Sequence, residues 1–385
     1  MTRTIGLALS GGGSRAAAFH LGCLRALNDR DLLAQVRVVS GISGGSLLAS
    51  LWAYGPADFA DFDARTTELL RAGLQWDILR KALTPAAAAR NLTAATRARA
   101  KGLFSRTVAV TRTANRTDAL ATLLAERAFG TKTMDQVTHP GLDTVITATD
   151  LATTNAVRFG STLSSCSRYG TITEPVQVAT AVAASAAFPL LLPAMERTFT
   201  FERVGQLQRH TVLLTDGGVF DNLGLSVLEP GRNAAFTPQV FNVPYVIACD
   251  AGQGELPSQA PHFIARRVAR SFETVHRKNQ DAGRARLHEW GATGRIDGFT
   301  LAYLGMKDHR LPAPPADLVP RERVATYPTN FKAMNQADFT ALTTRGEQLM
   351  RTLLPFGTPP APSTRMTQHA KPWTTGESPA FPGSG

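Results

Sequence analysis

The sequence predicts an α/β protein, and three observations support this fold class. Segments with strand-like composition alternate with segments of helical periodicity over most of the 385 residues. Hydrophobic residues make up 43% of the chain and charged residues 18%, which is enough apolar material for a large core and excludes general disorder. No repeat period or heptad run occurs, so collagen-like and coiled-coil architectures are also excluded.

The N-terminal part of the chain begins with a strand–helix–strand–helix pattern. We expect strands at residues 4–9 and 36–40, and helices at residues 15–28 and 46–54. Residues 57–130 are rich in Ala, Leu and Arg and are expected to be mostly helical.

Strand and helix signals continue to alternate in the rest of the chain. Strands are expected at residues 144–149, 156–159, 211–214, 245–249 and 298–304. Helices are expected at residues 179–187, 263–290 and 335–354.

The domain organisation follows from length and composition. The length allows two to three domains, or one large α/β domain with insertions. We expect one domain over residues 1–355, in which residues 57–130 form a helical, arginine-rich insertion. Pro, Gly, Ser and Thr dominate the rest, so residues 356–385 are expected to form a disordered tail.

The cysteines and the N-terminus bear on localisation. Cys23, Cys166 and Cys249 are too few and too scattered for a disulfide framework, so we expect them to be reduced. The apolar stretch at residues 5–9 is too short for a signal peptide, and three prolines interrupt the uncharged stretch at residues 175–195. A cytoplasmic or peripheral membrane protein without a signal peptide or a transmembrane helix is expected.

The net charge of +11 favours anionic partners: nucleic acid, acidic lipid headgroups or phosphate-bearing substrates. Nucleic-acid binding has no support beyond charge, because zinc-knuckle spacing, interleaved aromatic and basic residues and recognisable modules are all missing from the sequence. His, Cys and Asp do not cluster at metal-ligand spacing, so neither a metal nor another cofactor is expected.

The most specific local signal is Gly41-Ile42-Ser43-Gly44-Gly45, a G-x-S-x-G turn between an expected strand and an expected helix. At such a nucleophile elbow the serine backbone is strained, and a Cβ at either flanking glycine would collide with the neighbouring strand or helix. The helix N-terminus favours negative charge developing at the hydroxyl. The pattern therefore favours Ser43 as a nucleophile over a plain glycine turn.

A glycine-rich loop, Ser10-Gly11-Gly12-Gly13-Ser14-Arg15, separates the first expected strand from the first expected helix. Its backbone amides can converge on an anion, either as an oxyanion hole or as a dinucleotide phosphate cradle. The dinucleotide fingerprint also needs an acidic residue at the end of the second strand, and residues 38–41 contain none. The oxyanion hole is therefore the better interpretation.

Asp216-Gly217-Gly218 directly follows the expected strand at residues 211–214. A carboxylate at a strand end, followed by glycines, suits a general base for Ser43, and an ordinary Asp-Gly turn is equally compatible. For a Ser-His-Asp triad, His309 is the one histidine in a strand-to-loop setting after Asp216. Too few strands precede the serine for that topology, and His20 is expected to be a packed helix residue.

Together these motifs resemble the patatin-like phospholipase family. The resemblance rests on Gly11–Arg15, the G-x-S-x-G turn, Asp216-Gly217-Gly218 and Ala184-Ser185-Ala186-Ala187-Phe188-Pro189, in this order over residues 5 to about 225. Tyr327-Pro328-Thr329-Asn330-Phe331 is similar to a bacterial branch of the family. One departure is Ala16, where the family has a glycine.

The resemblance implies a three-layer α/β/α sandwich with a mostly parallel central sheet, and a Ser-Asp dyad without histidine. Ser43 would be the nucleophile and Asp216 the base. The remaining site residues would be the oxyanion-hole amides and the supporting positions, namely Gly11, Gly12 and Gly13, with Arg15, Gly41, Gly45 and Gly217.

The implied reaction is hydrolysis of fatty-acyl esters of phospholipids or other acyl lipids through an acyl-serine intermediate, as in phospholipase A or lysophospholipase. The alternatives are a carboxylesterase or thioesterase on soluble acyl substrates, and a catalytically silent lipid-binding protein. An ordinary Asp has a pKa of about 3.9, a poor match for deprotonating a serine near neutral pH. We therefore expect Asp216 to be partly buried.

Basic residues are concentrated between Arg71 and Arg116, with ten Lys or Arg against one acid, Asp77. This stretch is expected either to dock on an anionic membrane surface and feed acyl chains to Ser43, or to form a solvated helical face, and the sequence leaves both open. A second basic run, Arg266–Arg286, carries mixed signs and favours a solvated helix face.

Overall fold

The computed structural model describes residues 4–82, 115–189, 191–234, 237–255 and 262–354. The chain divides into two units, Met1–Leu353 and Leu354–Gly385. The expected tail and residues 83–114 of the expected insertion, which hold much of the Arg71–Arg116 stretch, lie outside the described residues.

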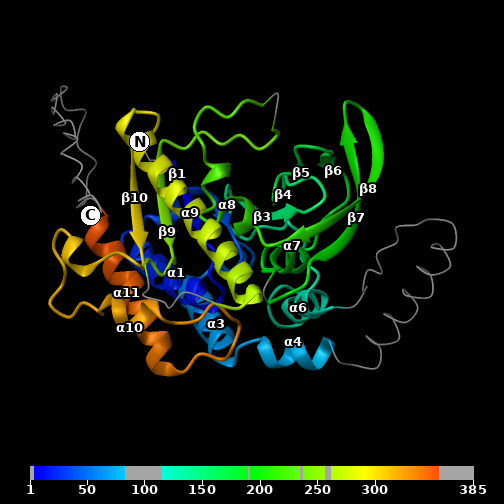
Figure 1. Cartoon of the computed structure of the whole chain (residues 1–385). Coiled ribbons are helices and arrows are strands. Elements are labelled where there is room, and N and C mark those ends of the chain that lie inside the picture. The colour runs from blue at the N-terminus through cyan, green and yellow to red at the C-terminus, as the bar shows by residue number, and fades with distance from the viewer. Residues whose placement is uncertain (1–3, 83–114, 190, 235–236, 256–261, 355–385) are drawn as a thin grey trace, which may run out of the picture. The chain divides into compact units, whose positions relative to one another are not determined.

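Within the first unit, ten strands of the described residues form one sheet in the order β10-β9-β1-β2-β3-β4-β5-β6-β7-β8 (Figure 1). The strands are β1 (Ile5–Leu9), β2 (Val36–Gly41), β3 (Asp143–Asp150), β4 (Ala156–Gly160), β5 (Ser164–Cys166), β6 (Gly170–Ile172), β7 (Met195–Arg203), β8 (Gln206–Thr215), β9 (Tyr245–Asp250) and β10 (Gly298–Tyr303).

The first half of the sheet is parallel. Strands β10, β9, β1, β2 and β3 run in the same direction, with Leu9 opposite both Gly41 and Cys249. All five residues of β1 and all six of β9 are buried, as expected for parallel strands covered on both faces. The carboxyl ends of β1, β2 and β9 therefore meet at one edge of the sheet.

The second half is antiparallel and barrel-like. From β3 to β8 each strand pairs antiparallel with the next, and β8 pairs back onto β3 at Thr149–Thr215 and Asp150–Leu214. The α/β class is confirmed, but the sandwich around a mostly parallel sheet is wrong, because six of the ten pairings are antiparallel. The physical reason is the short connections, such as Val204-Gly205 between β7 and β8, which can join only antiparallel neighbours.

The described residues contain ten α-helices. They are α1 (Gly13–Asn28), α2 (Gly44–Tyr54), α3 (Phe59–Ala72), α4 (Gln75–Ala82), α6 (Arg116–Leu124), α7 (Val178–Ser185), α8 (Gly218–Asp221), α9 (Ile264–Ala292), α10 (Arg321–Ala325) and α11 (Gln336–Leu353). None of these helices combines the length and the apolar composition needed to cross a bilayer.

Helices α1 and α11 cross at very short range because glycines face each other's backbone. A Cβ on Gly22 would lie 1.9 Å from the carbonyl oxygen of Thr343, and a Cβ on Gly346 would lie 2.1 Å from that of Phe19. Fourteen of the sixteen residues of α1 are buried, so this helix is a central support of the fold. The glycine loop that precedes α1 is thereby held in a fixed position.

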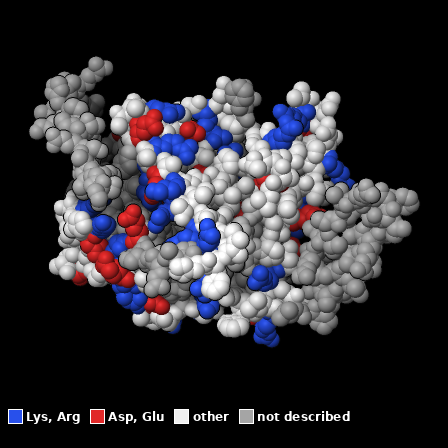
Figure 2. All heavy atoms as spheres, viewed as in Figure 1, with Lys and Arg blue, Asp and Glu red and all other residues white. Residues whose placement is uncertain are grey.

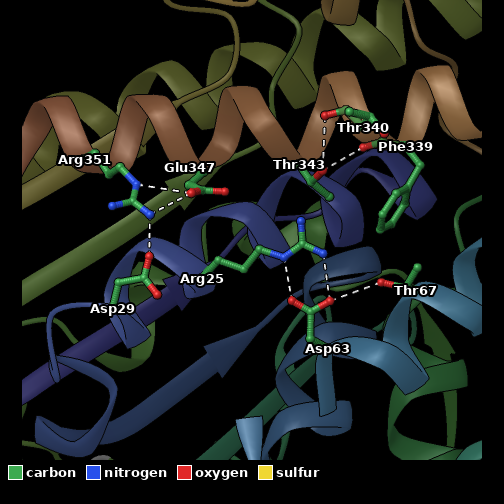
Figure 3. A network of polar contacts seen from close by, with 9 residues as sticks. All are labelled: Arg25, Asp29, Asp63, Thr67, Phe339, Thr340, Thr343, Glu347 and Arg351. Atoms are coloured by element: carbon green, nitrogen blue, oxygen red, sulfur yellow. Dashed lines mark hydrogen bonds and ion pairs between the residues drawn. The ribbon is translucent and has the colours of Figure 1, made fainter. Parts of the chain in front are cut away.

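Ion pairs connect the C-terminal end of α1 to α3 and α11 (Figure 3). The Arg25 guanidinium donates to both carboxylate oxygens of Asp63 on α3, at 2.5 and 2.7 Å. Arg351 of α11 donates to Asp29, and to Glu347 at 2.7 Å. A bidentate arginine–carboxylate pair is specific in geometry, so these contacts fix how α1 is oriented between α3 and α11.

Candidate active site

Ser43 occupies a sharp turn between β2 and α2. Its backbone has φ of 51° and ψ of −118°, a strained conformation for a residue with a side chain. A Cβ on Gly45 would lie 2.2 Å from the carbonyl oxygen of Leu9, and one on Gly41 would lie 2.7 Å from Cα of Ser46. The glycines at both flanking positions are therefore required by packing, as a nucleophile elbow demands.

Asp216 directly follows β8 and is 1% exposed. Its Oδ1 accepts a hydrogen bond from the Gly218 amide at 2.7 Å, whereas its buried Oδ2 has no hydrogen-bond partner in the described part of the chain. Burial raises the pKa of this carboxyl to about 7, and the nearby Ser43 hydroxyl and the Gly218 amide oppose that rise. Asp216 is thus more deeply buried than the sequence led us to expect.

Ser185, at the C-terminal end of α7, holds the two turns together. Its hydroxyl accepts a hydrogen bond from the Ser43 amide at 2.9 Å, and its carbonyl accepts one from Gly217 at 3.1 Å. The amide of Asp216 donates to the carbonyl of Ala187 at 3.0 Å. The segment Ala184–Pro189 therefore positions the serine and the carboxylate, which gives a physical reason for its presence among the motifs.

Ser43 and Asp216 line one cavity of about 710 Å³ together with Gly11 and Gly12. Gly217 lies beneath Asp216, where a Cβ would be 2.1 Å from the carbonyl oxygen of Thr147. The structure thus brings together in one cavity the serine turn, the Asp-Gly-Gly turn and the glycine loop.

The glycine loop offers two amides without acceptors. Gly12 and Gly13 have φ of 145° and 60°, conformations that favour glycine. The Gly11 amide donates to the carbonyl of Asn222 at 3.0 Å, but the amides of Gly12 and Gly13 have no acceptor among the described residues. Of the three expected oxyanion-hole amides, two are therefore unpaired and one is engaged in the fold.

Arg15 ties the glycine loop to the C-terminal part of the chain. Its Nε donates to the carbonyl of Ala251 at 3.1 Å, and its Nη1 donates to Tyr327 and Thr329 at 2.8 and 3.0 Å. Burial lowers its pKa to about 10, against the opposing charge of Asp250. With the Ser14 amide bonded to the carbonyl of Asn330 at 2.9 Å, the segment 327–331 braces the loop.

Sequence reasoning missed several residues of this cavity. Asn222 lies between the glycine loop and the Asp-Gly-Gly turn, since its Oδ1 would be 2.3 Å from a Cβ on Gly11 and 2.4 Å from one on Gly218. His276 of α9 also lines the cavity, and burial lowers its pKa to about 4, so it is neutral near pH 7. Asn222 was within reach of sequence reasoning, because it lies six residues after Asp216.

A buried charge cluster at the end of β9 was also missed. Asp250 accepts hydrogen bonds from Arg284, from Gln280 at 3.1 Å and from the Gly252 amide at 2.7 Å. The Arg284 guanidinium lies 4.2 Å from the centre of the Tyr303 ring. The sequence does show Asp250 as an acid at the carboxyl end of an expected strand. The other residues of the cluster come from α9 and β10, which sequence alone does not place beside it.

His309, His20 and the three cysteines do not line the cavity that contains Ser43. His309 lies in a short 3₁₀ turn, Asp308–Arg310, and does not line the cavity. His20 is fully buried in α1, and burial lowers its pKa to about 3. The three cysteines are free and buried. The described residues contain no group of three or more His, Cys, Asp or Glu that could hold a metal ion.

Solved structures share the fold at low sequence identity. Human GIVD cytosolic phospholipase A2 is 15% identical with a TM-score of 0.53, over 91% of this chain and 59% of that one. Its complex with methyl gamma-linolenyl fluorophosphonate and terbium chloride is 15% identical with a TM-score of 0.51, over 91% and 57%. This chain therefore spans less than two thirds of those chains, and no curated protein matches it significantly.

One family model matches a long, continuous part of the sequence that includes several of the motifs. The family described as "Patatin-like phospholipase" matches residues 7–228, which is more than half of the chain and includes the glycine loop, Ser43 and Asp216. The chain therefore belongs to the patatin-like phospholipase family.

Proposed function

We propose that this protein is a serine lipid acyl hydrolase that cleaves fatty-acyl esters through an acyl-serine intermediate, with Ser43 as nucleophile and Asp216 as base. The observation that carries the proposal is the convergence of a strained serine and a buried carboxylate in one cavity. Family membership supports lipid esters as the substrate class.

The proposed reaction has two halves. Asp216 accepts the proton of the Ser43 hydroxyl while Oγ attacks the acyl carbonyl carbon, and the carbonyl oxygen becomes an oxyanion. Collapse breaks the ester C–O bond, the alcohol leaves with the proton from Asp216, and the acyl group stays on Ser43. Water then attacks the acyl-serine with Asp216 again as base, which releases the fatty acid and restores the serine.

The environment of Asp216 suits this role. General acid–base catalysis is most efficient when the pKa of the catalytic group lies near the operating pH, and burial moves the Asp216 pKa to about 7. No histidine is needed to bring a proton acceptor into the neutral range.

The unpaired amides of Gly12 and Gly13 are the proposed oxyanion donors. Both belong to a loop fixed by α1 and Arg15, so they need no reorganisation as charge develops. The loss of one such donor in other enzymes costs about 2.7–4 kcal/mol in transition-state stabilisation. We propose that Gly11 contributes because it has no side chain, which lets the acyl carbonyl of the substrate come close to the loop.

Release of fatty acid from phospholipid tests the proposal. The purified chain should release fatty acid from phosphatidylcholine and lysophosphatidylcholine, whereas Ser43→Ala should release none above the solvent rate. A rate increase when a short-chain ester passes from monomers to micelles indicates a lipase, and equal rates indicate an esterase. Retained hydrolysis by Ser43→Ala would refute the proposal, and inert wild-type protein would favour a silent lipid-binding protein.

A further inference from the structure

Helix α9 carries a row of exposed hydrophobic side chains. Ile264, Val268 and Val275 are 78%, 65% and 69% exposed, and Phe263, directly before the helix, is 74% exposed. Spacings of four and seven residues place the three helical positions on one face. We call Phe263, Ile264, Val268 and Val275 the α9 apolar row.

The N-terminal half of α9 lies on the surface of the first unit (Figure 1). No described side chain between Ile264 and Asn279 is buried, whereas Leu287 and Trp290 in the C-terminal half are. The contacts that hold the outer half include the ring of Phe272, 5.6 Å from that of Phe188. The apolar row is therefore not part of the core that stabilises this unit.

The opposite face of the same half-helix forms a wall of the candidate active site. Arg270, Thr274 and Arg277 line the cavity that contains Ser43, at the spacing of one helix face. The polar face of α9 thus faces the cavity and the apolar face is bare, the reverse of the arrangement in a helix that packs on a core. A surface in contact with the apolar row would lie across α9 from the cavity, about 10–12 Å away.

Positive charge accompanies the row. Arg266, Arg267 and Lys278 are exposed, and Lys and Arg side chains follow the course of α9 in Figure 2. Glu273, the one acid of this half, pairs with Arg270 at 3.1 Å, and Asp281 in the following turn pairs with Lys278 and Arg284. Arg266, Arg267 and Arg277 have no ion-pair partner within the described ranges, which leaves net positive charge on this half of α9. Arg267 and Lys278 follow Ile264 and Val275 by three residues each, so these two cations flank the apolar row.

We propose that the N-terminal half of α9 is a docking surface for an anionic lipid bilayer, in which the apolar row enters the interface and the neighbouring cations contact acidic headgroups. Apolar side chains flanked by Lys and Arg are the pattern of helices that lie in the plane of a membrane. The proposal rests on the proposed function for its choice of lipid, since the same helix lines the cavity of a lipid hydrolase. It also revises the solvated helix face expected for Arg266–Arg286.

Vesicle binding tests this proposal in the Ser43→Ala background, so that turnover plays no part. The row variant is Ile264→Ser with Val268→Ser and Val275→Ser. The matched control is Val204→Ser with Leu207→Ser, two hydrophobic positions of the β7–β8 hairpin that are 95% and 66% exposed. Cosedimentation is measured with vesicles of phosphatidylcholine and phosphatidylglycerol in equal parts, and with phosphatidylcholine alone.

We expect the parent and the control to bind the mixed vesicles equally, and the row variant to bind about tenfold or more weakly. A charge variant, Arg267→Glu with Lys278→Glu, should lose the preference for phosphatidylglycerol. Circular dichroism and the thermal midpoint verify that each variant is folded. Ser43→Ala can bind vesicles even if the wild-type protein hydrolyses nothing, so the docking surface and the proposed function can fail separately.

Equal vesicle binding by the row variant and the parent would overturn the docking surface, as would an equal loss in the control. Light scattering of the same samples tests the other occupant, a second copy of the chain. If the row variant converts a dimer into a monomer while vesicle binding stays unchanged, the row serves self-association and the lipid proposal is wrong.

Discussion

The raised pKa of Asp216 gives the proposed reaction a defined pH dependence. A base must be unprotonated, so below its pKa of about 7 the active fraction falls about tenfold per pH unit. We predict that kcat/KM on a monomeric ester rises with pH through about 7 and then levels off. A rise in kcat/KM centred near pH 4 would instead indicate a solvated carboxylate, and the proposed role of burial would be wrong.

The same carboxyl links stability to pH. Its pKa is higher in the folded chain, about 7, than in the unfolded chain, about 3.9, so the folded state binds the proton more tightly. The protonated carboxyl of Asp216 therefore stabilises the folded state fully below about pH 4, and this stabilisation is lost as pH rises through 7. Asp216→Asn has no such proton to lose.

We accordingly predict that Asp216→Asn gains stability relative to the wild type between pH 4 and 7, by about 1.4 kcal/mol per pH unit and by on the order of 4 kcal/mol in all. Urea unfolding of both proteins at several pH values measures this difference, and other titrating groups cancel in the comparison. A difference that does not change with pH would mean that Asp216 has an ordinary pKa.

The motifs of the sequence placed Ser43 and Asp216 correctly at turns after strands, because glycine spacing is a local requirement. The role of Ser185 as a bridge was not predictable, since it depends on where α7 ends relative to β2 and β8. The engagement of the Gly11 amide by Asn222 was not predictable either, because an amide's orientation depends on tertiary contacts.

Among the helices, the α1–α11 crossing makes the clearest stability prediction. In Gly22→Ala the added Cβ would lie 1.9 Å from the carbonyl oxygen of Thr343, so the helices must separate. Alanine's higher helix propensity raises the free energy of unfolding by at most about 1 kcal/mol, and overpacking lowers it by about 1–3 kcal/mol or more. The variant should therefore unfold at lower urea concentration, and an unchanged or higher midpoint would contradict the close crossing.

Most strands and helices follow from periodicity, but three strands of the antiparallel half, β5, β6 and β7, were missed. In β7, charged Glu196 and Arg197 precede the alternating Phe199 and Phe201, so the strand signal starts late. Strands β5 and β6 have three residues each, too few for a periodic signal. These strands exist because their neighbours pair with them, and single-sequence patterns do not carry that information.

At the scale of the whole described unit, barrel closure explains how two distant turns meet. Ser43 follows β2, which pairs with β3, and Asp216 follows β8, which also pairs with β3. The closing pair Thr149–Thr215 lies one residue before Asp216. In a sheet that was parallel throughout, β8 would not pair back onto β3. The predicted topology was therefore wrong at the pairing that brings Ser43 and Asp216 together.

The proposed mechanism depends most on Ser43 and Asp216 acting as a pair. The most direct measurement is the rate and position of labelling by a fluorophosphonate, mapped by mass spectrometry, in the wild type, in Asp216→Asn and in a control, Asp297→Asn, at an exposed carboxyl remote from the cavity. We predict a single adduct on Ser43, formed about 10²–10⁴-fold more slowly in Asp216→Asn and at an unchanged rate in the control. An adduct on another residue, or equal rates in Asp216→Asn and the wild type, would contradict it.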